Sequence, residues 1–310
     1  MANLKGRDLL TLVEYSRDDI YHLLAKGLEL KRRRRLGDGT KPLETKTVAM
    51  LFEKPSTRTR VSFEAGLTHL GAHGVYLGGE ELQLARGETI EDTGRVLSRY
   101  VDAIVLRTFG HERVEAMADA AAVPVINALS DTHHPCQALA DLLTVLERKD
   151  RLAGLRIAYV GDGNNVCNSL MIGAAKVGAR ISVATPPGYE PAEDVMELVD
   201  RCISGFADTV KVTNDAREAV AGADVVYTDV WVSMGQDEER VKRVAEFDGY
   251  QVNAKLMRAA KRDALFMHCL PAHRGEEVSA DVIDGANSVV FDQAENRLHA
   301  QKALLVALIG

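Results

Sequence analysis

Short apolar runs alternate with helical patterns along most of the chain. The runs 47–52, 101–106 and 123–128 are rich in Val, Ile, Leu and Ala, and segments with apolar residues at helical spacing separate them. Strands that read as apolar runs, alternating with helices, are typical of βαβ units and of a parallel sheet covered on both faces. In the first half we expect strands at 47–52, 74–77, 101–106 and 123–128, and helices at 60–70, 90–100, 114–122 and 135–146.

The same alternation restarts after a polar segment at 147–154, with the sequence ERKDRLAG. In the second half we expect strands at 155–160, 181–184, 210–212, 225–229 and 265–268, and helices at 165–177, 191–204 and 215–221. A length of 310 residues is typical of two domains. We therefore predict an α/β protein with two open, mostly parallel domains, 1–147 and 148–310, and a cleft between them. The apolar helix expected at about 294–309 would pack back across the boundary onto the first domain.

The net charge of −7 argues against a partner that is itself a polyanion, such as a nucleic acid or a membrane surface. No apolar run reaches the roughly 18 residues of a membrane helix, and the charged start MANLKGRDLL is unlike a signal peptide. The four cysteines form no Cys-x-x-Cys pair, so neither a zinc ribbon nor a disulfide framework is indicated. We expect a cytoplasmic location.

In open α/β sheets, ligands bind beyond the carboxyl ends of the strands. The segment that follows the run 47–52 reads Glu-Lys-Pro-Ser-Thr-Arg-Thr-Arg, with Ser56 and Thr57 where a helix N-cap belongs. A helix N-terminus offers free N–H groups to an anion, and Arg58 adds a fork that grips a phosphate with two hydrogen bonds. Capping alone explains Ser56, but not two hydroxyls and two arginines in one turn, so we favour an anion site.

Two further strand ends carry polar residues in the first half. Arg107 follows the run 101–106, where a ligand-binding arginine and an ordinary surface arginine are equally compatible with the sequence. His134 and Gln137 open the helix after the run 123–128, and a His-Pro helix start is more often structural than catalytic. His133, His134 and Cys136 do not have the spacing of metal ligands, and we expect no metal site.

The second half places three segments after strands. Gly161-Asp-Gly-Asn-Asn-Val lacks the third glycine of a dinucleotide fingerprint, so a nicotinamide-dependent dehydrogenase is disfavoured and Asn165 is free to bind a carboxylate. Asp229 could pair with an ammonium and Ser233 with a carboxylate, although an Asx turn and a flexible loop explain them as well. Cys269 follows His268, and a Cys nucleophile with this His as base is conceivable, but neighbours on a strand point to opposite faces.

Together these segments resemble the aspartate and ornithine carbamoyltransferases along the whole chain. Ser-Thr-Arg-Thr-Arg after a strand is similar to the family's carbamoyl-phosphate signature, and His-Pro-Cys-Gln at 134–137 is similar to its His-Pro-x-Gln element. The resemblance implies that Ser56, Thr57, Arg58, Thr59 and Arg107 hold the phosphate. Arg107, His134 and Thr59 would meet the carbonyl oxygen, and Gln137 the carbamoyl amide. It also implies that Gln83 reaches the phosphate of a neighbouring subunit, and so a homotrimer or an assembly of trimers.

The second half resembles the ornithine-specific members through Asp-x-x-x-Ser-Met-Gly at 229–235 and His-Cys-Leu-Pro at 268–271. The resemblance implies that Asn165, Asp229, Ser233 and Met234 bind ornithine. Cys269, Leu270 and Arg297 would hold the carbamoyl group, and Arg107, His134, Asp229, Cys269 and Arg297 would be catalytic. The implied reaction transfers the carbamoyl group of carbamoyl phosphate to the δ-amine of L-ornithine, in arginine biosynthesis or in reverse, without metal or organic cofactor. A non-catalytic carbamoyl-phosphate sensor is the other alternative.

Overall fold

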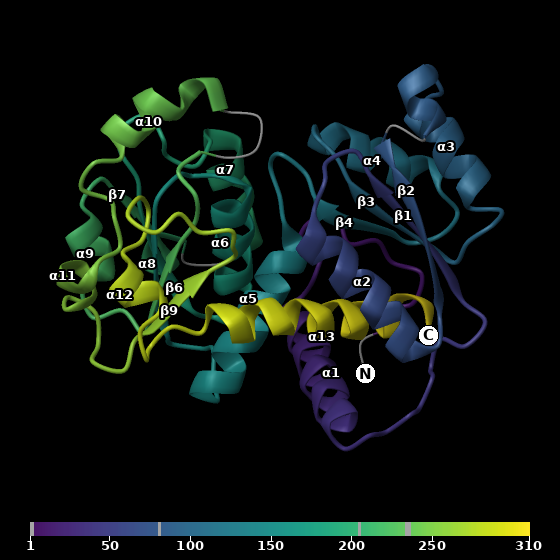
Figure 1. Cartoon of the computed structure of the whole chain (residues 1–310), viewed down its shortest axis with the longest axis horizontal. Coiled ribbons are helices and arrows are strands. Elements are labelled where there is room, and N and C mark those ends of the chain that lie inside the picture. Colours follow the sequence, from purple (N-terminus) through teal and green to yellow (C-terminus); the bar gives the residue numbers. More distant parts are fainter. Residues whose placement is uncertain (1–2, 80–81, 204–205, 233–236) are drawn as a thin grey trace. The chain divides into compact units, whose positions relative to one another are not determined.

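The computed structural model describes residues 3–79, 82–203, 206–232 and 237–310 (Figure 1). The chain divides into two compact units. Unit 1 comprises Met1–Leu143 and Glu295–Gly310, and unit 2 comprises Thr144–Ala294. The division falls inside two helices, α5 (Pro135–Lys149) and α13 (Val290–Ile309), so each unit contains a part of both.

Unit 1 is built on a four-stranded sheet with the order β2-β1-β3-β4, in which every pairing is parallel. The strands are β1 (Thr47–Phe52), β2 (His73–Gly78), β3 (Ala103–Arg107) and β4 (Val125–Leu129). From β1 the chain crosses to β2 at one edge and then returns to β3 on the other side of β1. Because such crossovers are right-handed, a reversal of direction places the connecting helices on opposite faces of the sheet.

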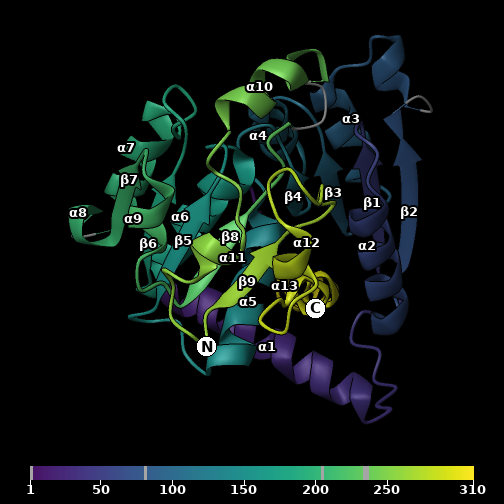
Figure 2. The same cartoon turned by 60° about the vertical axis from the view of Figure 1, so that its left-hand side comes forward.

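Unit 2 repeats this plan with five parallel strands in the order β7-β6-β5-β8-β9. The strands are β5 (Arg156–Val160), β6 (Arg180–Ala184), β7 (Val210–Thr213), β8 (Val225–Thr228) and β9 (Leu265–His268). Figure 2 shows β6, β5, β8 and β9 side by side in that order. The prediction of two mostly parallel α/β domains is therefore confirmed.

Helices connect the strands in both units. Besides α5 and α13, they are α1 (Arg17–Arg35), α2 (Thr57–Leu70), α3 (Ile90–Leu97), α4 (His111–Ala120), α6 (Asn165–Val177), α7 (Glu193–Cys202), α8 (Phe206–Thr209), α9 (Ala216–Val220), α10 (Arg240–Glu246), α11 (Ala254–Met257) and α12 (Ala280–Ile283). Two short 3₁₀ helices, η2 (Gln83–Arg86) and η3 (Asp237–Glu239), also lie in the described part.

Several element ends differ from the sequence-based expectation. Arg107 is the last residue of β3 rather than the residue after it, and the register against β4 shifts at this point. Asp229, expected inside a strand, follows β8 directly. Helix α5 continues through Glu147 to Lys149, so the first part of the polar segment 147–154 is helical. Strand and helix ends depend on single hydrogen bonds, which an apolar pattern does not encode.

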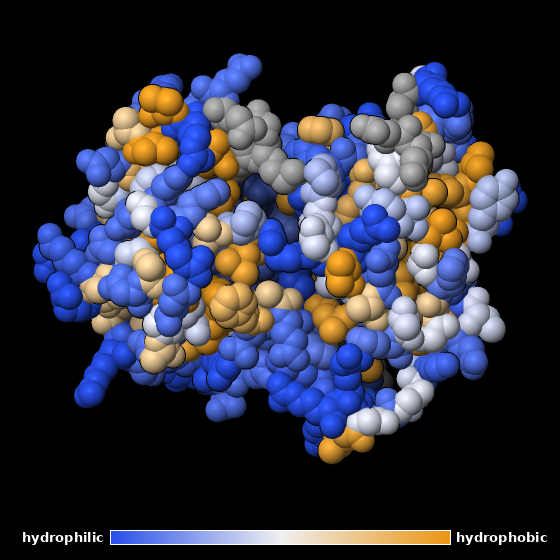
Figure 3. Space-filling view, viewed as in Figure 1, coloured by the Kyte–Doolittle hydropathy of each residue, from blue (hydrophilic) through white to orange (hydrophobic). Residues whose placement is uncertain are grey.

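The central strands β1, β3, β5 and β8 are almost entirely buried, whereas the edge strands β2 and β7 are largely half-buried or exposed, and each unit has its own apolar core beside its sheet. In Figure 3 the hydrophobic residues on the visible face form small groups separated by hydrophilic ones. In the part of the chain that the structure describes, no helix combines the length and the apolar character needed to cross a membrane.

Candidate active site

Each sheet has one point where its strand order reverses. In unit 1 this point lies between β1 and β3, because the chain goes from β1 to β2 on one side and to β3 on the other. In unit 2 it lies between β5 and β8. The crevice at such a point, beyond the carboxyl ends of the strands, is where open α/β sheets bind ligands.

Helix α2 begins directly after β1, with Ser56 as its N-cap. The Ser56 hydroxyl accepts a hydrogen bond from the Thr59 backbone N–H at 3.3 Å and donates one to Thr59 Oγ1 at 3.0 Å. Thr57 and Arg58 are exposed in the first turn, which contains no acidic residue. The helix N-terminus therefore keeps free N–H groups and positive charge, as an anion site requires.

Arg107 lies at the adjacent strand end and is only 6% exposed. Burial, followed by the positive charges of Arg297 and Arg58, lowers its pKa to about 10. The guanidinium stays protonated at neutral pH, so three mutually repelling cations lie near one another. A bound anion relieves that repulsion, and this is the electrostatic signature of an anion-binding cluster.

His134 lies directly before α5 and is buried. Burial, followed by the charges of Arg297, Arg107 and Arg58, holds its pKa well below the ordinary value of 6.5. The imidazole is therefore neutral at pH 7. A neutral ring offers one N–H donor and one acceptor, which suits hydrogen bonding to a carbonyl oxygen better than phosphate binding.

Arg297 connects the cluster to two further helices. Its Nη1 donates to Gln137 Oε1 on α5 at 2.6 Å, and its Nη2 donates to Thr59 Oγ1 on α2 at 3.0 Å. Gln137 Nε2 in turn donates to Asp141 Oδ1 at 2.8 Å, which fixes the orientation of the amide. Unit 1 thus brings together Thr59, Arg107, His134, Gln137 and Arg297, residues that are far apart in the sequence.

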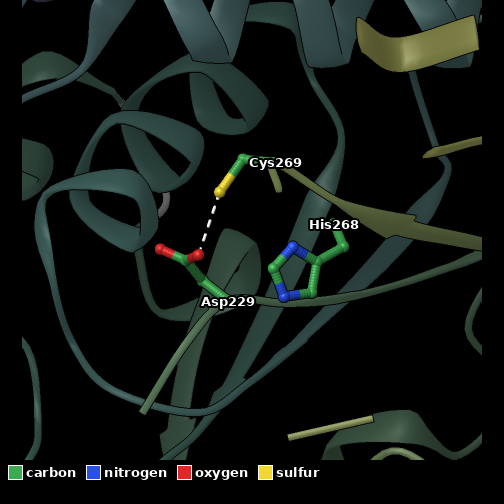
Figure 4. A group of neighbouring side chains, drawn as sticks. All are labelled: Asp229, His268 and Cys269. Atoms are coloured by element: carbon green, nitrogen blue, oxygen red, sulfur yellow. Dashed lines mark hydrogen bonds between the residues drawn. The ribbon is translucent and has the colours of Figure 1, made fainter. Parts of the chain in front are cut away.

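The reversal point of unit 2 is built around Asp229. Asn164, the N-cap of α6, accepts from the backbone N–H groups of Val166 and Cys167 at 3.0 and 3.1 Å. Its Nδ2 donates to Asp229 Oδ2 at 2.9 Å, and Cys269 Sγ donates to Asp229 Oδ1 at 2.9 Å. Figure 4 shows the Cys269 thiol directed at this carboxylate. Asp229 is therefore held by two neutral donors and carries the negative charge of the site.

His268 supports the turn that carries Cys269. Its Nδ1 accepts from the Leu270 backbone N–H at 2.8 Å, so the ring proton is assigned to Nε2, which donates to Glu277 Oε1 at 3.2 Å. Burial acts to raise the pKa of Glu277, but the hydrogen bonds from His268 and from the His273 backbone outweigh it and lower the pKa. Leu270 has a φ of 60°, in the left-handed region. Strand β9 ends at His268, and the chain turns directly after it.

Comparisons with known proteins agree with this geometry. The model of the aspartate/ornithine carbamoyltransferase carbamoyl-phosphate-binding domain matches residues 7–147, and that of the Asp/Orn-binding domain matches residues 153–308. The ornithine carbamoyltransferase of Anoxybacillus flavithermus is 57% identical over 99% of this chain and 98% of that protein. The chain belongs to the aspartate/ornithine carbamoyltransferase family.

Solved structures of the family extend the likeness to three dimensions. The ornithine carbamoyltransferase from Pyrococcus furiosus has a TM-score of 0.96 and 54% identity, covering 100% of this chain and 99% of that one. The enzyme from Thermus thermophilus has a TM-score of 0.88 and 44% identity, covering 98% of this chain and 99% of that one. A relative from P. furiosus named as the anabolic ornithine carbamoyltransferase is 54% identical over 100% of this chain and 98% of that protein.

Four residues that the sequence analysis named are not part of the contacts described above. Gln83 begins η2 and is exposed, and Asn165 is the first residue of α6. Ser233 and Met234 lie outside the described residues. The chain just before them is anchored, because Arg243 Nη1 donates to the Trp231 carbonyl oxygen at 2.9 Å and to Asp162 Oδ2 at 2.8 Å.

Lys54 and Asn164 are the residues that sequence reasoning missed. Burial and the positive charge of Arg107 lower the pKa of Lys54, and its Nζ lies 4.2 Å from the centre of the Phe109 ring. Lys54 therefore adds a cation beside Arg107. The position of Lys54 between β1 and the N-cap of α2 is a sequence signal that could have identified it. Asn164 was passed over in favour of Asn165, because the sequence alone does not tell a capping asparagine from its neighbour.

Asp229, His268 and Cys269 are also close enough to hold a metal ion, since their potential ligand atoms lie within 4.8 Å of one another (Figure 4). This corrects the expectation that the side chains of His268 and Cys269 point apart, which assumed that the strand continues. Both ring nitrogens of His268 are already bonded to Leu270 and Glu277. A metal would have to displace one of these partners, so the hydrogen-bonded arrangement does not favour metal binding.

Proposed function

We propose that this protein transfers the carbamoyl group of carbamoyl phosphate to the δ-amine of L-ornithine, giving L-citrulline and phosphate. The observation that carries the proposal is the pairing of opposite charges at equivalent places in two sheets. A cluster of arginines, of which Arg107 and Arg297 are buried, lies at the β1/β3 reversal point, and a carboxylate with neutral partners lies at the β5/β8 reversal point. A dianionic donor suits the first, and a cationic amino acid suits the second.

The carbamoyl-phosphate side uses the residues of α2, β3, α5 and α13. Ser56, Thr57, Arg58 and Thr59 bind the phosphate through hydroxyls, the helix N-terminus and a guanidinium. Arg107, the neutral His134 and Thr59 stabilise the negative charge that develops on the carbonyl oxygen. Gln137 and Arg297 orient the carbamoyl amide, with the backbone of Cys269 and Leu270 completing its contacts. Phosphate leaves without a strong acid, because its charge is already paired with arginine.

The ornithine side uses Asn165, Asp229, Ser233 and Met234. An alkylamine with a pKa of about 10.4 is protonated at pH 7, and its deprotonation costs about 4–5 kcal/mol at roughly 1.36 kcal/mol per unit. Desolvation and the nearby arginines lower that cost, whereas Asp229 positions the amine. The free amine then attacks the carbonyl carbon, and the C–O bond to phosphate breaks as the C–N bond forms. The amine loses its second proton to the departing phosphate or to solvent.

The biological setting follows the family. We place the carbamoyl-phosphate residues in domain 1–147 and the ornithine residues in domain 148–310, with Arg297 supplied by the C-terminal helix. We infer a cytoplasmic homotrimer or assembly of trimers, in which the exposed Gln83 reaches the phosphate of a neighbouring subunit. We assign the enzyme to arginine biosynthesis, the direction given by the name of the P. furiosus relative. Its substrates are small molecules, and no nucleic acid, membrane or cofactor takes part.

Citrulline formation tests the proposal directly. Purified protein should produce citrulline from carbamoyl phosphate and L-ornithine in buffer that contains a chelator. Aspartate and putrescine should be inactive as alternative acceptors. Activity with aspartate or putrescine and none with ornithine would refute the acceptor assignment. Carbamoyl-phosphate binding without turnover of any acceptor would instead identify a sensor.

A further inference from the structure

A cavity of about 220 Å³ lies in unit 1 at the opposite end of α2 from Ser56. Its lining includes Arg33 and Arg34 of α1, Asp38 and Lys41 of the following loop, His69 of α2 and Lys302 of α13. Helix α2 has 14 residues, so at 1.5 Å per residue the cavity is about 20 Å from the N-cap that begins the arginine cluster. The cavity is therefore separate from the carbamoyl-phosphate site.

Lys302 is the unusual member of this lining. It is only 4% exposed, and among the residues that the structure describes none accepts a hydrogen bond from its ammonium or pairs with it. Its stem runs past Gly66 of α2, where an added Cβ would lie 3.3 Å from Lys302 Cγ. In Figure 1 this part of α13 crosses α1 and α2. The Lys302 side chain is almost entirely buried, and its ammonium has no acceptor among the described residues, so a bound group of opposite charge is the natural complement.

Lys31, a buried lysine in the same region, has both a hydrogen-bond acceptor and an ion-pair partner. It is 3% exposed, its Nζ donates to Asn296 Oδ1 at 2.9 Å, and it pairs with Glu295 at 3.4 Å. Glu295 also bonds His299 at 3.3 Å, so this acid is already shared between two partners. Burial, and then the positive charge of Arg34, lower the pKa of Lys302. In the described part of the chain, Lys31 thus has counter-groups, whereas the charged neighbour of Lys302 is a further cation.

Apart from Asp38, the charged groups and the imidazole that line the cavity are donors or cations. Arg34 Nη1 contacts His69 Nε2, and His69 Nδ1 is buried with no hydrogen-bond partner among the described residues. The one acid in the lining, Asp38, is occupied. Its Oδ2 accepts from Arg33 Nε at 2.6 Å, and its Oδ1 accepts from the backbone N–H of Thr40 at 2.9 Å. Arg34, Lys41 and Lys302 remain as positive charges that no carboxylate of the described residues pairs with.

Basic residues at a helix C-terminus are common because they complement the helix dipole, and this accounts for Arg32–Arg35 at the end of α1. It does not account for Lys302, which comes from the interior of a different helix. Two features therefore point to a ligand independently of the dipole: a cavity open on one side, and an almost entirely buried lysine in its lining whose ammonium has no partner among the described residues.

We propose that this cavity, the second anion site, binds inorganic phosphate or a similarly small tetrahedral oxyanion. Its volume is below the roughly 300–1,000 Å³ typical of pockets for drug-sized ligands, and it corresponds to a few water molecules at about 30 Å³ each. That size admits a phosphate ion and excludes a nucleotide. Lys302 and Arg34 bind its oxygens, and Lys41 adds charge at the exposed side of the cavity.

Calorimetric titration with inorganic phosphate tests the second anion site. Because phosphate also binds at the arginine cluster in the proposed function, the wild-type chain should bind two phosphates. Lys302→Met keeps the length of the stem and removes the charge, and this variant should bind one. Arg34→Gln, at an exposed position, should weaken the second site about tenfold or more. Arg35→Gln, an exposed neighbour outside the cavity lining, should retain both sites.

The possible results distinguish a failure of the second anion site from a failure of the proposed function. If Lys302→Met and Arg34→Gln both bind two phosphates with wild-type affinity, the second anion site is refuted. If Lys302→Met does not fold, Arg34→Gln alone decides. Arg58→Ala should lose the other phosphate, and if it does not, the carbamoyl-phosphate site is wrong while the second anion site stands. In crystals soaked in tungstate, anomalous density beside Lys302 is expected, and density only beside Arg107 would overturn the proposal.

Discussion

The reversal points of the two sheets share a geometry and differ in charge. In each unit a strand ends, a capping side chain begins a helix, and a charged residue lies at or after the end of the adjacent strand. At β1/β3 the cap is a serine and the charged residue is Arg107, reinforced by Arg58 and Arg297. At β5/β8 the cap is an asparagine that donates to Asp229.

The difference shows how one fold is specialised for two substrates. The backbone supplies the same crevice and the same helix N-terminus in both units, so neither feature distinguishes an anion from a cation. The side chains at the strand ends make that choice. The arginine cluster is destabilised by its own repulsion until an anion binds, whereas Asp229 is balanced by the neutral donors Asn164 and Cys269.

Neutralising Arg107 should give the largest effect. In Arg107→Gln, kcat should fall by about 10²–10³, because the guanidinium stabilises charge that develops on the carbonyl oxygen only in the transition state. The KM for carbamoyl phosphate should also rise, and steady-state citrulline formation measures both. Lys46→Gln is the matched control, since Lys46 precedes β1 at the opposite edge of the sheet and pairs with Asp102 there. A kcat within threefold of wild type for Arg107→Gln would remove Arg107 from the chemistry.

Neutralising Asp229 in unit 2 should have a smaller effect, and this effect should be on the KM for ornithine. Asp229→Asn should raise the KM for ornithine about tenfold to a hundredfold, the range expected when one hydrogen bond to a charged group is lost. The KM for carbamoyl phosphate should stay near the wild-type value. Asp224→Asn, at the amino end of the same strand, is the matched control, because Asp224 pairs with Lys261 away from the crevice. If Asp229→Asn changed only the carbamoyl-phosphate constant, the assignment of substrates to the two units would be reversed.

The fold could be predicted because its signal is local. Apolar runs such as β1 and β8 are continuous in the sequence, and burial on both faces of a parallel sheet leaves this pattern in the central strands. The strand ends could not be fixed, and this matters at the site. Arg107 belongs to β3 and Asp229 lies outside β8, both by one residue relative to expectation.

The contacts at each reversal point were less predictable than the fold, because they join residues that are distant in the chain. Arg297 bonds Gln137 across 160 positions and Thr59 across 238, and no spacing rule connects them. Only the resemblance to the family brought Arg297 into the site. The turn at Cys269 was misjudged because strand alternation was extended one residue beyond His268, where β9 ends.

The smallest expected effect concerns the pH dependence of stability and tests whether His134 is neutral. Burial beside three arginines holds its pKa well below 6.5 in the folded chain, whereas the unfolded chain takes up the proton near pH 6.5. As the pH falls from 7 to 5, His134 becomes protonated in the unfolded chain and stays neutral in the folded chain. Protonation therefore stabilises the unfolded state, and the free energy of unfolding falls by at most about 1.4 kcal/mol per pH unit. Urea unfolding of His134→Asn should therefore show a shallower loss of stability over this range. His73→Asn, at an exposed position, should follow the wild type. Parallel curves for His134→Asn and the wild type would mean that the imidazole is protonated in the folded chain, and the arginine cluster would then have to accommodate a fourth positive charge.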